Sequence, residues 1–393
     1  MYPFSILQQI PKYNKDLLKY TVHEAQNALR FHRSIPGYQA TALESLDCKA
    51  KKAGIRALLV KDESTRFGLK AFKGLGGSYC MFRILCELLS LDPMTADYST
   101  FTDEHIKEQC QKIEFATATD GNHGKGVSWA ASLFGAKAHV YMPKGTVEAR
   151  RQAIEAAGSA TATITDMNYD DTVRYASAQA EENGWILIQD TAWDGYEQYP
   201  NWIIEGYLTM AEEIMNQSQG LMPTHIFLQA GVGSMAGGME SYFIERSGDV
   251  KPIVTIVEAS AADCIYRSVQ ANDGQPHTLD GNPETIMAGL NCGTPCKTIW
   301  PLLRDCSSFF ASCKDQVTME GMRSYRNPEG TDPLIISGES GAVTYGLVTY
   351  ILEDEDLRNL YQIDNESVIL LINTEGDTDP DKYKKIVWNG ENE

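Results

Sequence analysis

Short apolar runs rich in β-branched residues alternate along the chain with segments whose apolar residues recur every three to four positions. The first pattern is typical of strands and the second of amphipathic helices. Alternating strands and helices favour parallel sheets covered by helices on both faces, and this many units favours two sheets. The predicted strands lie at 57–61, 114–118, 138–142, 185–189, 225–229, 253–258 and 367–373.

Helix boundaries are marked by capping residues in two places. Thr146 is the predicted N-cap of one helix, which Gly158 ends. Asp170 is the predicted start of a second helix, and Gly184 follows its last residues as a stop signal. The predicted helices, including two recognised by periodicity alone, lie at 147–157, 170–182, 206–217 and 341–352.

The composition indicates a soluble globular protein and excludes several other classes. The chain has 393 residues, of which 43% are hydrophobic and 22% are charged. No apolar run is long enough to span a membrane, and the first residues do not form a signal-peptide pattern. The net charge of −19 argues against nucleic-acid binding, which needs a basic face. We therefore expect a cytoplasmic protein that binds neither membranes nor nucleic acid.

Nine cysteines are scattered along the chain without a Cys-x-x-Cys pair. No set of cysteines and histidines has the spacing of a zinc site, so no metal is expected. Free, mostly buried thiols are the simplest interpretation in a cytoplasmic protein. A bridge between two of them, for example Cys264 and Cys292, stays open from the sequence.

Ligands in α/β folds bind beyond the carboxyl ends of the strands, so the turns that follow the strands matter most. Asp120 and Asp190 each follow a predicted strand, and read singly each is an ordinary turn or cap residue. Residues 61–64 either frame a pocket or have a structural role. The turns with unusual residues lie at 61–64, 119–122, 189–191, 231–235 and 373–378.

A glycine-rich turn, AGVGSMAGG at 230–238, follows one predicted strand and opens a helix. Backbone N–H groups in such a turn, together with the helix N-terminus, form a phosphate-binding site. The turn also fits the loose dinucleotide fingerprint, with Glu258 placed to bind a ribose, which would indicate an NAD-dependent oxidoreductase. A plain packing turn is the third interpretation.

A lysine, Lys73, precedes glycines in the segment AFKGLGGSY. The segment is not a Walker A loop, because Gly-Lys-Ser/Thr is missing. Read alone, Lys73 is most simply a solvated residue at a helix start. Placed against Phe72 at a crevice, it can instead lose its proton and form a Schiff base.

The order of these features along the chain resembles the fold-type-II pyridoxal-phosphate enzymes, the tryptophan-synthase β family that includes serine and threonine dehydratases. That order is Lys73, a Gly-Asn-His-Gly turn, the glycine loop and Thr374 at a strand end. The likeness to the diaminopropionate ammonia-lyases within that class is closer still. It rests on the segments KDESTRFGLKAFK, ATDGNHGKGVSWAA, QDTAWDGY, LQAGVGSMAGG, TIMAGL, IISGESGAV and INTEGDTD.

This resemblance implies an α/β fold with two parallel-type sheets, in which a smaller domain is inserted into a larger one. The larger, pyridoxal-phosphate-binding domain is expected at 1–95 and 205–393, and the smaller domain at 96–204. A homodimer is also implied. A serine or threonine dehydratase of the same fold and a non-catalytic regulatory relative are the alternatives.

The implied reaction is an α,β-elimination that converts either enantiomer of 2,3-diaminopropionate into pyruvate and two ammonia. Lys73 matches the position that carries pyridoxal 5'-phosphate as a Schiff base. Asn122 matches the partner of its phenolic oxygen and Thr374 that of its pyridine nitrogen. The residues that match the phosphate loop are Gly231, Val232, Gly233, Ser234 and Met235.

Two aspartates match the family's catalytic bases, Asp120 for the D-substrate and Asp190 for the L-substrate. Two bases are needed because the enantiomers present their Cα–H bonds on opposite faces. Dehydratases commonly have serine where this chain has Asp120, and a carboxylate there suits the extra β-ammonium group of a diamino acid. Lys73 remains an alternative base. The N–H groups of Thr119, Asn122 and His123 are expected to bind the substrate carboxylate.

Overall fold

The computed structural model describes residues 2–119, 121–281 and 284–390. The chain forms two compact units. Unit 1 comprises Met1–Val22, Ala40–Arg66 and Met210–Glu393, and unit 2 comprises His23–Gln39 and Phe67–Thr209. None of the described helices is both long enough and apolar enough to cross a membrane.

Unit 1 is built on a seven-stranded sheet with the order β1-β10-β9-β8-β11-β3-β2. The five inner strands run parallel, and the two edge strands β1 and β2 pair antiparallel. The strands are β1 (Phe4–Gln8), β2 (Leu43–Ser45), β3 (Ala57–Asp62), β8 (His225–Gln229), β9 (Ile253–Ala259), β10 (Phe309–Cys313) and β11 (Val368–Asn373). The helices are α2 (Asp47–Ala53), α9 (Ser234–Arg246), α10 (Cys264–Ala271), α11 (Trp300–Cys306), α12 (Asp315–Arg326), α13 (Glu339–Glu353), α14 (Glu355–Tyr361) and α15 (Pro380–Val387).

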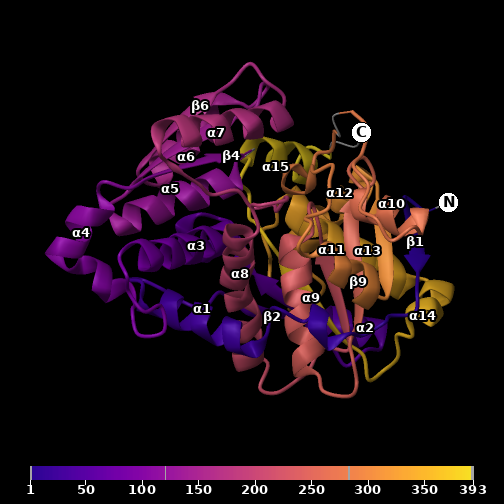
Figure 1. The fold of residues 1–393 in the computed structure, drawn as a ribbon. Coiled ribbons are helices and arrows are strands. Elements are labelled where there is room, and N and C mark those ends of the chain that lie inside the picture. The colour runs from indigo at the N-terminus through magenta and orange to yellow at the C-terminus, as the bar shows by residue number, and fades with distance from the viewer. Residues whose placement is uncertain (1, 120, 282–283, 391–393) are drawn as a thin grey trace. The chain divides into compact units, whose positions relative to one another are not determined.

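The inner strands of unit 1 are buried along most of their length because helices cover both faces of the sheet. Every residue of β8, β10 and β11 is buried, as expected for parallel strands. One face packs against α12 to α15, with Phe227, Ile369 and Leu371 in the same core as Val343 and Leu347. The labelled elements of this unit can be followed in Figure 1.

Unit 2 is built on a four-stranded, wholly parallel sheet with the order β6-β5-β4-β7. Its strands are β4 (Glu114–Ala118), β5 (Lys137–Met142), β6 (Ala160–Ile164) and β7 (Ile186–Leu187). Its helices are α3 (Lys73–Leu88), α4 (Glu104–Cys110), α5 (Asn122–Phe134), α6 (Glu148–Ala157) and α7 (Tyr169–Asn183). Two helices cross the unit boundary along the chain, α1 (Val22–Ser34) and α8 (Gln198–Gln217).

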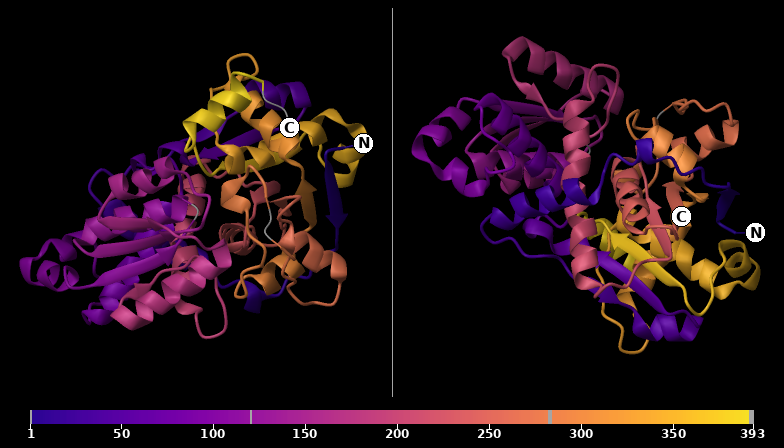
Figure 2. Two further views of the ribbon diagram at one scale, coloured as in Figure 1. Left: turned by 90° about the horizontal axis from the view of Figure 1, so that it is seen from above. Right: turned by 60° about the horizontal axis from the view of Figure 1, so that its bottom comes forward.

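Helices also cover both faces of the smaller sheet (Figure 2). Successive residues of a strand point to opposite faces, and β5 shows this directly. Val140 shares a core with Ile154 of α6, whereas its neighbour Tyr141 shares one with Ala176 of α7. The α/β class with two parallel-type sheets is therefore confirmed.

The predicted strands all form, and 114–118 and 225–229 match residue for residue. The strand predicted at 185–189 shrinks to two residues. Four strands were not predicted: three are short or half-buried edge strands, and the fourth is an inner strand whose two phenylalanines are followed by Ala, Ser and Cys. They are β1, β2, β6 and β10.

One predicted helix cap is wrong, and one predicted helix start is one residue late. Val147, not Thr146, is the N-cap of α6, and its side chain forms no capping hydrogen bond. The second helix, α7, begins at Tyr169 rather than Asp170, and Asn168 is its N-cap, because the Asn168 side chain accepts a hydrogen bond from the N–H of Asp171. Valine is a poor N-cap, so α6 begins without a side-chain cap, whereas asparagine and aspartate are both good caps, and helix ends shift by a residue or two.

The units divide the chain differently from the boundaries expected at 95/96 and 204/205. Residues 23–39, 67–95 and 205–209 belong with the middle of the chain. Phe31 of α1 stacks on Phe82 of α3 with ring centroids 4.2 Å apart. A Cβ atom on Gly76 of α3 would lie only 2.5 Å from the ring of Tyr207. These contacts hold α1, α3 and the start of α8 in unit 2, and the cofactor-binding role of the larger unit stays a prediction.

A buried ion network joins β3 to α8 in unit 1. The Lys61 ammonium lies 2.6 Å from a carboxylate oxygen of Glu213, and the Arg66 guanidinium lies 2.7 Å from both Glu213 and Glu63. All four side chains are at most 1% exposed. Although burial by itself raises the pKa of Glu213, Arg66 and Lys61 outweigh it and lower the pKa to about 2. Of the two interpretations of residues 61–64, the structural one is therefore observed for Lys61 and Glu63.

Replacing Glu213 by glutamine should strongly destabilise the protein, because Lys61 and Arg66 then lose a buried counter-charge. Breaking such a pair costs about 3–5 kcal/mol, which thermal melts would detect. The pKa of Glu213 is about 2 in the folded protein and 4.5 in the unfolded chain, so its ionised form stabilises the fold. This stabilisation is fully present above pH 4.5 and is lost as the pH falls towards 2. The melting temperature of Glu213→Gln should therefore fall less steeply with decreasing pH than that of the wild type.

The matched control is Glu329→Gln, which removes the partner of Lys52 in a surface pair whose side chains are 42% and 63% exposed. Its melting temperature should stay near that of the wild type, because exposed pairs contribute little. Equal effects of the two substitutions would contradict the account of the buried network.

Candidate active site

In unit 2 the turn between β4 and α5 is shaped by Thr119. This buried residue accepts hydrogen bonds at Oγ1 from the N–H groups of Gly121, at 3.0 Å, and Gly124, at 3.2 Å. Its own N–H donates to the carbonyl of Tyr141. The expectation that this N–H binds substrate is therefore wrong, because sheet pairing uses it. Among the described residues no acceptor takes the Thr119 hydroxyl hydrogen, and Asp120 lies outside them.

Lys73 begins α3 and is held against the first turns of α5, where Asn122 is the first residue. A Cβ atom on Gly126 would lie 2.9 Å from the carbonyl carbon and oxygen of Lys73. Real Cβ atoms do not approach this closely, so glycine at 126 permits the contact. Gly126 thus lets the start of α5 pack directly against the start of α3.

The Lys73 ammonium lies 2.6 Å from Oδ2 of Asp190, which follows the short strand β7. The two side chains are 19% and 15% exposed. The ammonium also lies 5.3 Å from the ring centroid of Phe72 and 5.7 Å from that of Tyr207. Two residues 117 positions apart in the sequence, each singled out from the sequence alone, are therefore direct partners.

The pairing sets the charge of Asp190. Burial by itself raises the pKa of Asp190, but the Lys73 ammonium, helped by His123, lowers it well below its usual range. Burial raises the pKa of the neighbouring Tyr207 hydroxyl, so that phenol stays neutral. Asp190 is therefore an anion at neutral pH, and Lys73 is the main cause.

His123 is buried next to this pair. Its Nε2 lies 3.0 Å from the carbonyl oxygen of Ile188, and its Nδ1 lies 3.8 Å from Oδ2 of Asp190. Burial lowers the pKa of His123, with the charge of Asp190 opposing and that of Lys73 reinforcing the shift. The ring is therefore neutral at neutral pH.

In unit 1 the glycine turn between β8 and α9 has the form of an anion site. Gly233 has φ +94° and is the N-cap of α9, with no side chain to accept from the first turn. In the described part of the chain, the N–H groups of Gly231, Val232 and Gly233 donate to no backbone carbonyl. Successive N–H groups ahead of a helix N-terminus suit a phosphate. Ser234 and Met235 form the first turn of that helix.

Thr374 lies at the end of β11, next to the end of β8. The buried amide of Gln229 donates hydrogen bonds to the carbonyl of Ile372, at 2.8 Å, and to Oγ1 of Thr374, at 3.1 Å. The Thr374 oxygen accepts this bond, and in the described part of the chain its hydroxyl hydrogen has no acceptor, so it can donate to a ligand. Gln229 was missed from the sequence, although a buried polar residue ending an apolar strand could have revealed it.

The alternative NAD-binding interpretation of the glycine turn does not survive the structure. The Glu258 side chain is fully buried, and its carboxylate accepts hydrogen bonds from the N–H groups of Ile265 and Tyr266 at the start of α10. It therefore does not present its oxygens to a ribose. All nine cysteines are free, so the bridge between Cys264 and Cys292 does not form.

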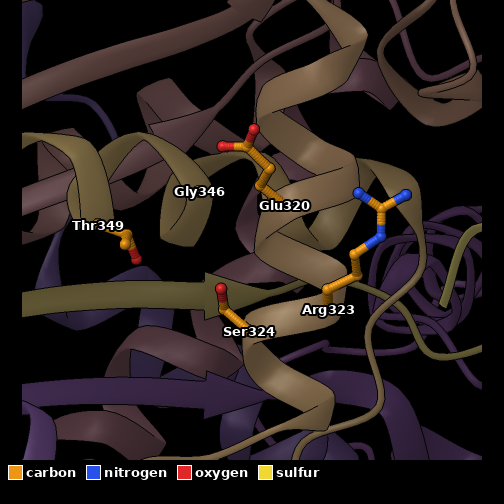
Figure 3. Close-up of a pocket in the computed structure, with 5 residues that line it drawn as sticks. All are labelled: Glu320, Arg323, Ser324, Gly346 and Thr349. Atoms are coloured by element: carbon orange, nitrogen blue, oxygen red, sulfur yellow. The ribbon is translucent and has the colours of Figure 1, made fainter. Parts of the chain in front are cut away.

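A pocket of about 240 Å³ lies elsewhere in unit 1, between the later turns of α12 and α13 (Figure 3). Glu320, Arg323 and Ser324 come from α12, and Gly346 and Thr349 from α13. These turns do not lie at the carboxyl ends of the strands, where α/β folds bind ligands. The pocket is therefore not the candidate site. The described residues also hold no cluster suited to a metal ion.

Comparisons with known proteins agree with these features. A family model described as "Pyridoxal-phosphate dependent enzyme" matches residues 35–375. A diaminopropionate ammonia-lyase from Salmonella typhimurium is 47% identical over 369 residues, which are 92% of this chain and 91% of the relative. This chain belongs to the diaminopropionate ammonia-lyases, within the pyridoxal-phosphate-dependent enzymes.

Solved structures of the diaminopropionate ammonia-lyase family support the assignment. The holo enzyme from Escherichia coli superposes with a TM-score of 0.90 at 43% identity, covering 99% of this chain and 97% of that one. The same enzyme in complex with D-serine gives a TM-score of 0.90 at 42% identity, with the same coverage. The fold-type-II class is confirmed, and an NAD-dependent oxidoreductase is excluded.

Proposed function

We propose that this protein catalyses the pyridoxal-phosphate-dependent elimination of ammonia from 2,3-diaminopropionate, using both enantiomers and giving pyruvate and two ammonia. The 2.6 Å contact between Lys73 and Asp190 carries the proposal, because it joins a cofactor lysine to a carboxylate base. The related ammonia-lyases support the substrate. A serine or threonine dehydratase is not favoured, since a hydroxy amino acid has no β-ammonium for a carboxylate to bind.

Each unit, taken by itself, carries residues that fit pyridoxal 5'-phosphate. Lys73 would carry it covalently, and the N–H groups of 231–235 would bind its phosphate. Thr374, with its hydroxyl hydrogen free of Gln229, would face the pyridine nitrogen, and Asn122 would bond the phenolic oxygen. The bound cofactor withdraws electrons from the substrate and so acidifies its Cα–H bond.

Asp190 would remove the Cα proton of the L-substrate. Its low pKa in the pair with Lys73 keeps it ionised, but an anion so stabilised is a weak base. A neutral Lys73 amine would leave burial as the dominant influence, which raises the pKa of Asp190 and strengthens it as a base. Lys73 is the alternative base, because a neutral amine beside Asp190 could take the same proton.

Asp120 would serve the D-substrate, because the two enantiomers present their Cα–H bonds to opposite faces. The substrate carboxylate would be bound by the Thr119 hydroxyl and by the N–H groups of Asn122 and His123 at the start of α5. That helix runs over thirteen residues, and its N-terminus favours an anion. We further propose a homodimer in the cytoplasm, on the ground of family membership.

Replacing Lys73 by alanine should abolish covalent attachment of the cofactor. The purified variant should lack the visible absorbance of the wild-type holoenzyme, and borohydride reduction should leave no cofactor-modified peptide. Lys125→Ala is the matched control, because Lys125 lies in the same unit but bonds the carbonyl of Leu69. A Lys73→Ala protein that keeps the wild-type spectrum would refute the assignment.

Asp190→Asn should lower turnover of L-2,3-diaminopropionate by roughly 10²–10⁴-fold, the usual contribution of a general base, and affect the D-enantiomer far less. Asp120→Asn should show the reverse preference. Pyruvate release from each pure enantiomer measures both effects. Equal losses for both enantiomers in both variants would contradict the division of roles.

A further inference from the structure

The imidazole of His123 is fixed in one orientation by a single strong constraint. Its ring is 4% exposed, and Nε2 lies 3.0 Å from the Ile188 carbonyl. A carbonyl oxygen can only accept, so Nε2 must carry the hydrogen. In the neutral ring Nδ1 therefore presents a lone pair.

That nitrogen lies near the carboxylate of Asp190. Among the described residues Nδ1 has no hydrogen-bond partner, and it lies 3.8 Å from Oδ2 of Asp190. This distance is beyond hydrogen-bond length. Nδ1 of His123 and Oδ2 of Asp190 are thus two neighbouring acceptors without a proton between them. Leaving the buried Nδ1 unsatisfied costs free energy, which a proton shared with Oδ2 would recover.

We propose that His123 is a positioning residue for Asp190, and that its Nδ1 accepts the proton that Asp190 removes from the L-substrate. The inference rests on the proposed function and deepens it. The Nε2–H bond to Ile188 holds the ring so that Nδ1 stays directed at Oδ2. A small approach of the carboxyl group closes the gap to an O–H···N hydrogen bond.

The proton balance is complete without a further reactant. The Cα–H bond breaks, its electron pair stays on the substrate, and the proton goes to Oδ2 of Asp190 and is held with Nδ1 of His123. The Cβ–N bond then breaks, and its electron pair leaves with the nitrogen as neutral ammonia. That ammonia takes up the stored proton and departs as ammonium, which returns Asp190 and His123 to their first state.

The role of His123 follows from the neighbouring charge. Once the Lys73 amine is protonated again, it favours the ionised form of Asp190, and a proton on that carboxyl alone is then weakly held. An imidazole that takes the proton over from Oδ2 through this hydrogen bond lets Asp190 return to its anionic form while the proton is stored on Nδ1. Without Nδ1 the transfer has no such acceptor.

Two substitutions separate this role from simple anchoring. His123→Gln keeps an N–H donor for the Ile188 carbonyl but places no acceptor where Nδ1 lies. His123→Asn places an oxygen near the Nδ1 position but loses the bond to Ile188. We expect His123→Gln to lower kcat on L-2,3-diaminopropionate by roughly 10–100-fold with little change on the D-enantiomer, and His123→Asn to be the more active of the two on the L-enantiomer.

The reverse order, with His123→Gln near wild type and His123→Asn impaired, would mean that His123 only anchors Ile188 and would overturn the proposal. Equal losses on both enantiomers in His123→Gln would overturn it as well. Asp190→Asn distinguishes this failure from failure of the proposed function. If Asp190→Asn keeps its turnover of the L-substrate, the role of Asp190 and the role of His123 are both wrong. If Asp190→Asn loses that turnover and His123→Gln does not, only the role of His123 is wrong.

A second readout needs no turnover. In isotope-labelled histidine NMR of the substrate-free protein, the signal lost in His123→Gln identifies His123. It should show a protonated Nε2 and an unprotonated Nδ1 at neutral pH. Asp190→Asn should lower the pKa of His123, because the Asp190 charge raises it. A protonated Nδ1, or a pKa that does not respond, would contradict the geometry.

Discussion

The contact between the Lys73 ammonium and the Asp190 carboxylate is the interaction on which the proposed chemistry depends. It holds the lysine near its partners, keeps the aspartate ionised and ties a helix start to a strand end. The backbone around it is built for close approach, since Gly126 lets α5 touch the carbonyl of Lys73. Losing either charge would change the protonation of the other and of His123.

Unit 1 contains two groups of polar residues with different roles. Its glycine turn offers N–H groups that find no backbone partner among the described residues, and Gln229 donates a hydrogen bond to the Thr374 hydroxyl oxygen. A separate network of Lys61, Arg66 and Glu213 secures β3 and α8 through buried charge pairs. The first group is suited to a ligand because its donors remain available, whereas the second is structural because its charges satisfy one another.

The sequence predicted the class of fold and the strands well, because apolar β-branched runs covered on both faces leave a clear pattern. It could not place edge strands such as β1 and β2, whose pairing depends on distant partners. The same limit explains why residues 67–95 were expected with the wrong segment, since glycine packing of α3 on α5 is invisible to periodicity. Lys73 and Asp190 were singled out by motif, but their 2.6 Å contact required the structure.

The most direct test of the account is pyruvate release by the purified holoenzyme from D-2,3-diaminopropionate, L-2,3-diaminopropionate and L-serine, measured in parallel. The account predicts turnover of both diamino enantiomers well above that of serine. Turnover of serine alone would contradict it and would indicate a dehydratase, in which the carboxylate at position 190 pairs with Lys73 without serving a diamino substrate.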